Sequence, residues 1–225
     1  MIVLSRCHTS KAVEVRNMDG GGDGKYEREG VCKSLTVWRK SLLFSCNGFT
    51  VIDSDGKLVF RVDNYMDGHR EEILLMDGSG NPLLTMRRKK LMTFVENWLI
   101  FEGEGSEEVC RSRSAKKKPT PIFCVRKHMN LLSSNSSVLA HVFTGSSSSN
   151  TRFLYVIEGS YCQRSCQVLD ESRKVMAEIK RKEAMSQGGR GGISFGVDVF
   201  LLIVRSDFNP GLAMSLVLLL DQMFS

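Results

Sequence analysis

The 225-residue sequence predicts an all-β domain, a closed barrel or a sandwich of antiparallel strands, with one hydrophobic helix at its C-terminus. Three observations support this prediction. Short apolar runs alternate with turn residues along most of the chain, one strand–turn–strand unit recurs, and residues 212–220 would be apolar on every side of a helix. With 42% hydrophobic and 25% charged residues, the chain can form one sizeable core, which excludes a wholly disordered protein.

The first 30 residues differ in composition from the rest. Residues 20–24 read GGGDG among charged neighbours, so we expect a flexible N-terminal segment at 1–30 and a folded domain at 31–225. The apolar stretch ahead of Arg6 is too short for a secretory signal. A membrane-spanning helix needs about 20 consecutive apolar residues, and the sequence has no such run, so an intracellular protein is expected.

A strand–turn–strand unit occurs three times. The turns DSDG, DGSG and the degenerate DESR, which begin at Asp53, Asp77 and Asp170, each separate two runs rich in β-branched, aromatic or other apolar residues. Side chains in residues 58–62 alternate as expected of a half-buried antiparallel strand. Each unit therefore predicts a β-hairpin.

Between and after the hairpins, the chain contains more short apolar runs. Further strands are expected at 91–102, 122–127, 138–143, 152–158 and 195–204. Two polar stretches without periodicity, 103–121 and 144–150, are expected to be exposed loops.

The C-terminal segment predicts a single helix. Asn209 is a suitable N-cap and Pro210 suits the first helical position. The following residues, 212–220, are too few to span a bilayer, so the helix is expected to fill the interior that the strands enclose. A charge at Leu216 or Leu218 should then unfold the domain.

Three segments of the chain are informative in combination: WRKSLLFSCNGFTVIDSDGKLVFRVDNY (38–65), EEILLMDGSGNPLLTMRRKK (71–90) and LAMSLVLLLDQMF (212–224). Together they resemble the LURP-one-related proteins, a largely plant family whose domain is similar to those of tubby and the phospholipid scramblases. The resemblance extends over about residues 31–225. It implies a tubby-like closed antiparallel barrel of roughly twelve strands that encloses the hydrophobic C-terminal helix.

The motifs of common enzymes and metal sites are missing from the sequence. The four histidines have no spacing typical of a metal or nucleophile site, and we expect no enzyme activity, cofactor or metal, although a site assembled from distant residues stays open. The turn at Asp53 resembles the start of a calcium loop, but Lys57 and Val59 are poor ligands. Cys162 and Cys166 lack the second ligand pair of a zinc site, and all seven cysteines are interpreted as thiols.

The strongest functional signal is basic, in a chain with a net charge of +6. The strand clusters supply the candidate lipid-binding residues Arg87, Arg88, Lys89, Lys90, Lys180 and Lys182. Strand alternation should let only about half of each cluster face one membrane. The alternative is that these charges only solubilise the strands and protect their edges.

A third basic cluster lies in the polar stretch 103–121. Lys116, Lys117 and Lys118 follow Ser112 and Ser114. This pattern suits a nuclear-import patch or a phosphorylation-tuned electrostatic switch, with a simple solvated loop as the alternative.

These observations lead to one functional hypothesis and two alternatives. The chain is expected to be a non-enzymatic intracellular protein that binds phosphoinositide or another anionic membrane lipid peripherally. The resemblance implies a link to plant defence or stress, with the cytoplasm, the plasma membrane surface and the nucleus as locations. The alternatives are a protein-interaction scaffold that does not bind lipid and a barrel that holds a small apolar ligand. We expect a monomer with unknown protein partners and without direct nucleic-acid binding.

Overall fold

The computed structural model describes residues 32–43, 47–63, 72–89, 96–104, 119–129, 137–145, 152–182 and 196–225. The predicted N-terminal segment at 1–30 lies outside these ranges. The strands are β1 (Cys32–Trp38), β2 (Phe49–Ile52), β3 (Leu58–Val62), β4 (Glu72–Asp77), β5 (Pro82–Lys89), β6 (Asn97–Glu102), β7 (Phe123–Lys127), β8 (Val138–Thr144), β9 (Tyr155–Ser160), β10 (Ser165–Asp170), β11 (Val175–Arg181) and β12 (Val199–Arg205), and the helix is α1 (Pro210–Phe224).

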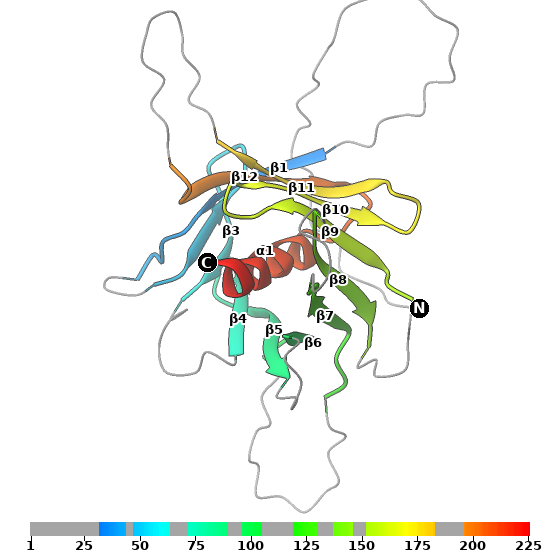
Figure 1. The fold of residues 1–225 in the computed structure, drawn as a ribbon. Coiled ribbons are helices and arrows are strands. Elements are labelled where there is room, and N and C mark those ends of the chain that lie inside the picture. The colour runs from blue at the N-terminus through cyan, green and yellow to red at the C-terminus, as the bar shows by residue number, and fades with distance from the viewer. Residues whose placement is uncertain are drawn as a thin grey trace, which may run out of the picture.

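The strands form one closed antiparallel barrel. Consecutive strands pair with each other, and β1 also pairs with β12, in register from Cys32 opposite Arg205 to Trp38 opposite Val199. Figure 1 shows the strands arranged around α1, which is drawn in red at the centre. The predicted closed barrel around a hydrophobic C-terminal helix is therefore confirmed, and the sandwich is excluded.

The barrel has two distinct ends. Because all neighbouring strands are antiparallel, consecutive strands finish at opposite ends. The turns after β2, β4 and β10 lie at one end, which we call the turn end. Strands β1, β5, β7 and β11 finish at the other end, which we call the basic end after the cationic residues described below. Around the ring, β5 and β11 lie on opposite walls, because β6 to β10 separate them on one side and β12, β1, β2, β3 and β4 on the other.

The start of α1 matches the sequence prediction. The Asn209 side-chain oxygen accepts a hydrogen bond from the backbone N–H of Leu212 at 2.9 Å, and Pro210 takes the first helical position. Since β12 finishes at the turn end, the helix begins there. Its other end contacts residues of the basic end, among them Lys127, so α1 passes along the lumen.

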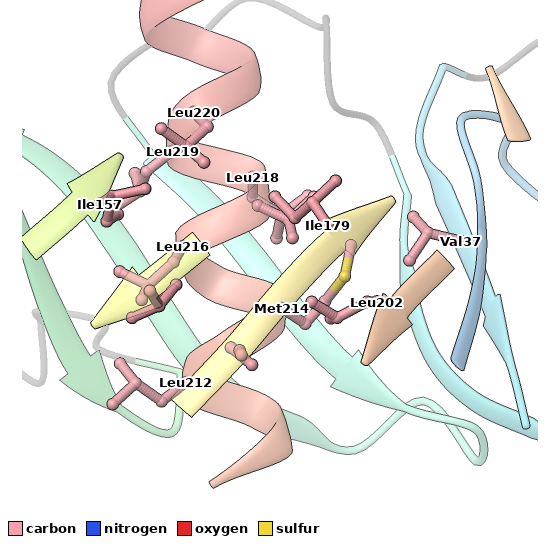
Figure 2. Packing of buried hydrophobic residues seen from close by; sticks show 14 of the residues in the cluster. Val37, Ile157, Ile179, Leu202, Leu212, Met214, Leu216, Leu218, Leu219 and Leu220 are labelled. Atoms are coloured by element: carbon pink, nitrogen blue, oxygen red, sulfur yellow. The ribbon is translucent and has the colours of Figure 1, made fainter. Parts of the chain in front are cut away.

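The helix fills the lumen of the barrel. Every residue from Gly211 to Asp221 is buried. Figure 2 shows leucines of α1 among Ile157, Ile179 and Leu202 of the surrounding strands, all members of one apolar cluster. Full burial of each large apolar side chain contributes about 1.5–3 kcal/mol, which explains why a helix with no polar face is stable here.

The three predicted hairpins share one construction. In each turn the first aspartate accepts backbone hydrogen bonds through Oδ1 from the residues two and four positions later, at 2.8 to 3.0 Å. In each hairpin the register shifts by a bulge next to the turn. The fourth turn residue has a positive φ, which is 78° at Gly56, 90° at Gly80 and 67° at Arg173. The degenerate third copy therefore keeps the backbone of the other two, with an arginine in the position that favours glycine.

The remaining predicted strands are present with shifted bounds. Those at 122–127, 138–143 and 152–158 correspond to β7, β8 and β9, and their limits differ because strand pairing, not apolarity alone, decides where a strand ends. The strands expected at 91–102 and 195–204 are β6 and β12, but 91–95 and 195 lie outside the described residues. Most of the two predicted loops, 105–118 and 146–150, also lies outside them.

Candidate functional site

Cationic side chains gather at the basic end of the barrel. They come from strands on every side of the ring and from the segments that follow them: Arg39, Lys40, Arg61, Arg87, Arg88, Lys89, Arg126, Lys127, Arg164, Lys180, Arg181 and Lys182. The acidic residues described near this end are Asp63, Glu72, Glu96, Glu158, Glu178, Asp198 and Asp221. At the turn end the balance is reversed, with Asp53, Asp55, Asp77, Glu102, Glu104, Asp170, Glu171 and Asp207 against Lys33, Lys57, Arg152, Arg173, Lys174 and Arg205. Charge is therefore distributed asymmetrically along the barrel axis.

The outward-facing part of the predicted β5 cluster is Arg87 and Lys89. Arg87 Nε lies 2.6 Å from Glu72 Oε2 on β4, and the guanidinium lies over the Phe101 ring at 5.4 Å. Lys89 is the last residue of β5 and shares the outer face with Arg87, since alternate residues of a strand point the same way. Lys90 lies outside the described residues.

Arg88 points to the other face, as the alternation predicts. It is paired with Trp98, a residue of the core, so it lies on the inner face at the mouth of the lumen. Its guanidinium is 2.6 Å from Glu96 Oε1, while Lys127 Nζ is 3.6 Å from the other oxygen of the same carboxylate. Lys127 also donates a hydrogen bond to the Met223 carbonyl at 2.5 Å. Arg88 therefore belongs to a charged network over the C-terminus of α1.

The β11 cluster lies on the opposite wall at the same end. Lys180 and Lys182 share the outer face, as predicted, and Arg181 lies opposite a core residue of β12. Lys180 Nζ is 2.9 Å from Glu178 Oε2, with 53% of the lysine side chain exposed. Lys182 Nζ donates to Thr36 Oγ1 at 3.1 Å, which brings it beside β1.

The third predicted cluster is not placed. Lys116, Lys117 and Lys118 lie outside the described residues. The strands before and after them, β6 and β7, are joined at the turn end. The two strand clusters thus share the basic end, whereas the described residues that flank the tri-lysine segment belong to the other end.

Three carboxylates of the turn end are held in their charged form by hydrogen bonds. The pKa of Asp77 is lowered, chiefly by the side-chain amide of Asn81 and then by its backbone N–H. The pKa of Asp170 is lowered chiefly by the hydroxyl of Ser172. Asp207 has its pKa lowered to about 2 by hydrogen bonds from Lys174 and Arg205. These three carboxylates therefore stay anionic well below neutral pH.

Exposed apolar side chains also concentrate at the basic end, which the sequence did not lead us to predict. The exposed large hydrophobic residues in the described part of the chain are Trp38, Leu42, Leu43, Ile122, Met129 and Val197. All except Ile122 follow or precede strand termini at the basic end. Leu42 is 53% exposed and Trp38 46%. The signal that could have identified them is the interleaving of apolar and basic residues in WRKSLL at 38–43.

The segment from Arg39 to Leu43 is fixed by hydrogen bonds. The Arg39 N–H donates to the Asp198 carbonyl at 2.8 Å, and Thr50 Oγ1 donates to the Lys40 carbonyl at 2.7 Å. Ser41 Oγ donates to Asp63 Oδ1 at 2.8 Å and accepts from the Leu43 N–H at 3.0 Å. The leucines therefore project from an ordered segment.

A buried ionic cluster links this segment to the end of α1. The Asp221 carboxylate, 1% exposed, accepts from Tyr161 Oη at 3.0 Å and lies 3.3 Å from Arg39 and 4.0 Å from Arg164. Arg164 is itself buried and donates through Nε to the Val197 carbonyl at 2.8 Å. Asp221 is the sole charge in α1, which is the signal that could have pointed to it. The helix thus holds the exposed apolar segments in place.

Two histidines come together on the outer wall. The rings of His128 and His141 are 5.3 Å apart, edge to face. The pKa of His141 is lowered, first by burial and then by the charges of His128 and Arg126.

No group of three or more potential metal ligands occurs within the described ranges. Across the same ranges, no helix is long and apolar enough to cross a membrane.

Comparisons with known proteins agree on one family. The family model described as LURP-one-related matches residues 33–221. Protein LURP-one-related 17 of Arabidopsis thaliana is 48% identical over 199 residues, covering 87% of this chain and 85% of the relative. Protein LURP-one-related 8 of the same plant is 48% identical over 203 residues, covering 87% and 92%. The X-ray structure of an Arabidopsis thaliana protein matches with a TM-score of 0.56 at 23% identity, covering 84% of this chain and 90% of that one, which shows a shared fold.

Proposed function

The chain belongs to the LURP-one-related family, and on that premise we propose that it is a non-enzymatic protein that binds anionic membrane lipid peripherally through the basic end of its barrel. One observation carries this proposal. The cationic residues of β5 and β11 lie on opposite walls but at the same end. A planar anionic surface that approaches along the barrel axis meets both clusters at once.

In this end-on orientation, both the outward-facing and the inward-facing residues of a strand cluster can meet the membrane. Strand alternation therefore no longer restricts binding to about half of each cluster. A membrane against the side wall would meet only outward-facing residues of one cluster, such as Lys180 and Lys182. At the rim, inward-facing Arg88 and Lys127 are at the mouth of the barrel and lie beside outward-facing Lys89. Each basic residue near an anionic leaflet contributes about 1 kcal/mol, so several residues at one end give useful affinity.

The ion pairs at this end are compatible with lipid binding. Arg88 is paired with Glu96 and Lys180 with Glu178, and both basic side chains are about half exposed. Exposed pairs contribute only about 0–1 kcal/mol, so a multiply charged phosphate headgroup can compete with a single carboxylate. This favours a phosphoinositide over a singly charged lipid.

The family context extends the proposal to a cellular role. The relatives reported above are plant proteins. We therefore propose a regulator of defence or stress responses that is tethered to the cytoplasmic face of the plasma membrane, with the nucleus as a second location after release. A small apolar ligand in the lumen is disfavoured, because α1 occupies that space.

Vesicle sedimentation tests lipid binding. The basic-end variant Arg88→Gln/Lys89→Gln/Lys180→Gln/Lys182→Gln is compared with the turn-end variant Lys33→Gln/Lys57→Gln/Arg152→Gln/Lys174→Gln, which loses the same charge. Vesicles contain phosphatidylcholine and phosphatidylserine, with or without phosphatidylinositol bisphosphate. We expect the basic-end variant to bind at least about tenfold more weakly, and about a thousandfold more weakly if all four residues contribute about 1 kcal/mol each. The turn-end variant should bind like the wild type.

Two results would count against the proposal. Equal pelleting of the two variants would show that the basic end is not the binding surface. Absence of wild-type pelleting on every vesicle, together with capture of a protein partner in a salt-insensitive manner, would favour the protein-interaction scaffold.

A further inference from the structure

We propose that the barrel docks end-on and inserts the exposed apolar residues of the basic end into the bilayer interface. The residues are Trp38, Leu42, Leu43 and Val197. This inference rests on the proposed membrane binding and adds the orientation and a hydrophobic component. Electrostatic attraction alone would hold the protein at the lipid headgroups. Insertion would also bury apolar side chains of the protein below them.

The position of these residues is the first support. Trp38 ends β1, Leu42 and Leu43 follow it, and Val197 lies just before β12, the strand paired with β1. They therefore lie at the neighbouring ends of two paired strands, and we call these four residues the apolar rim. Exposed apolar patches bordered by polar residues are typical of interaction surfaces.

The cations around the apolar rim supply charge complementarity with anionic lipid. Lys40 Nζ lies over the Trp38 ring at 5.5 Å. Lys182 reaches Thr36, the residue two positions before Trp38 on the same outer face. Lysines beside tryptophan and leucine are the arrangement found at membrane interfaces, where ammonium groups meet phosphates and apolar side chains enter the acyl boundary.

The apolar rim is also preorganised. Its leucines project from a segment held by Asp198, Thr50 and Asp63, and the Val197 carbonyl is held by buried Arg164. Because these groups are already ordered in the free protein, binding costs little conformational entropy, which favours insertion.

The closed barrel favours a membrane over a protein strand as the occupant. The described sheet has no free edge, so a partner cannot bind by adding a strand to it. A fifth exposed apolar residue of this end, Met129, follows β7 on the opposite side of the ring. A planar bilayer can meet both sides of the rim together with the cations of β5 and β11.

Tryptophan fluorescence provides the test, because the chain has two tryptophans in opposite environments. Trp38 is exposed at the rim, whereas Trp98 is 2% exposed inside the barrel and its Nε1 has no hydrogen-bond partner among described groups. Trp98→Phe leaves Trp38 as the single reporter, and Trp38→Phe leaves the buried one. The probe is a set of phosphatidylcholine, phosphatidylserine and phosphatidylinositol bisphosphate vesicles that carry brominated acyl chains.

We expect a blue shift and strong quenching for Trp98→Phe, and neither for Trp38→Phe. If Trp98→Phe fails to fold, loss of wild-type quenching in Trp38→Phe gives the same information. As a second measurement, Leu42→Ser/Leu43→Ser should bind these vesicles about tenfold more weakly. The matched control Ile122→Ser at the turn end should bind like the wild type.

The outcomes separate the two proposals. Suppose that vesicle binding depends on the basic-end cations, but that Trp38 is not quenched and Leu42→Ser/Leu43→Ser has no effect. This result would overturn insertion of the apolar rim and would leave electrostatic binding supported. Absence of any wild-type binding to these vesicles overturns both.

Discussion

The turn end and the basic end are built from the same strands, but residues close in sequence form the hairpins of the first, whereas distant segments come together at the second. The turn end has three short hairpins, each closed by an aspartate that accepts two backbone hydrogen bonds. The basic end has cations from opposite walls, exposed apolar residues and the C-terminus of α1, held by the buried Asp221. One end is determined by local sequence, and the other exists only after the barrel closes.

This difference explains which residues are free for function. Turn-end carboxylates are used by their own backbone, and their substitution should change stability. Many basic-end side chains are exposed and make only surface ion pairs, so their substitution should change binding while the fold is kept.

The element shared by both ends should be the most sensitive to change. Leu218 is fully buried at the middle of α1, so Leu218→Asp places an unpaired carboxylate in the core and should cost more than about 4–5 kcal/mol. We expect loss of the cooperative thermal transition in circular dichroism, whereas Leu218→Met should keep it. An unchanged melting curve for Leu218→Asp would show that the helix does not fill the barrel.

The buried cluster of the basic end should rank second. Asp221→Asn removes the charge partner of buried Arg164 and should lower the free energy of unfolding by about 3 kcal/mol. The loss should be accompanied by faster hydrogen exchange at residues 38–43, because Arg39 is released as well. The control Asp207→Asn should destabilise much less, because the Asp207 side chain is 46% exposed. Similar losses for both variants would show that burial of the Asp221 cluster adds no stability.

Acid should lower the stability that three turn-end aspartates contribute to the fold. The pKa values of Asp77, Asp170 and Asp207 are lowered in the folded state, the last to about 2, from a usual value of 3.8. A lowered pKa stabilises the fold above pH 3.8, and this contribution is lost as the pH falls towards the folded-state pKa.

Melting temperatures measured between neutral pH and strong acid check this expectation. The variant Asp77→Asn/Asp170→Asn, whose amide oxygens can still accept the turn hydrogen bonds, should lose less stability on acidification than the wild type. Identical acid sensitivity in the variant and the wild type would contradict the role given to the turn aspartates.

The smallest effects concern the fourth turn residue. Gly80 has a φ of 90°, so Gly80→Ala should cost about 1 kcal/mol. Arg173 has a φ of 67° and pairs with Glu158, so Arg173→Gly relieves backbone strain but loses an exposed ion pair. We expect a change below about 1 kcal/mol in chemical denaturation. If Arg173→Gly lowered the free energy of unfolding more than Gly80→Ala does, the third hairpin would depend on the ion pair between Arg173 and Glu158.

The sequence was sufficient for the parts of the molecule that depend on local chemistry. The turns at Asp53, Asp77 and Asp170 could be predicted because each is encoded within a few neighbouring residues. The cap at Asn209 and the burial of α1 could be predicted because an all-apolar short helix has one stable location outside a membrane. Closure into a barrel came from family resemblance, since strand periodicity alone also allowed a sandwich.

The site could be predicted only in part. Arg87–Lys89 and Lys180–Lys182 were visible as clusters, and their alternation between faces followed from strand geometry. Their meeting at one end depends on the number of antiparallel strands between β5 and β11, and their placement on opposite walls depends on the pairing of β12 with β1, which closes the ring. The exposure of Trp38 and Leu42 was missed because apolar residues in a β-protein are expected in the core.

End-on membrane binding can be tested by comparing hydrogen–deuterium exchange in the vesicle-bound protein and in the free protein. With vesicles of phosphatidylcholine, phosphatidylserine and phosphatidylinositol bisphosphate, we expect protection on binding at residues 38–43, 180–182 and 197–198. The hairpin turns at 53–57, 77–81 and 170–174 should exchange as in the free protein. Protection at the turn end, or along one side wall of the barrel instead of the basic end, would contradict end-on membrane binding.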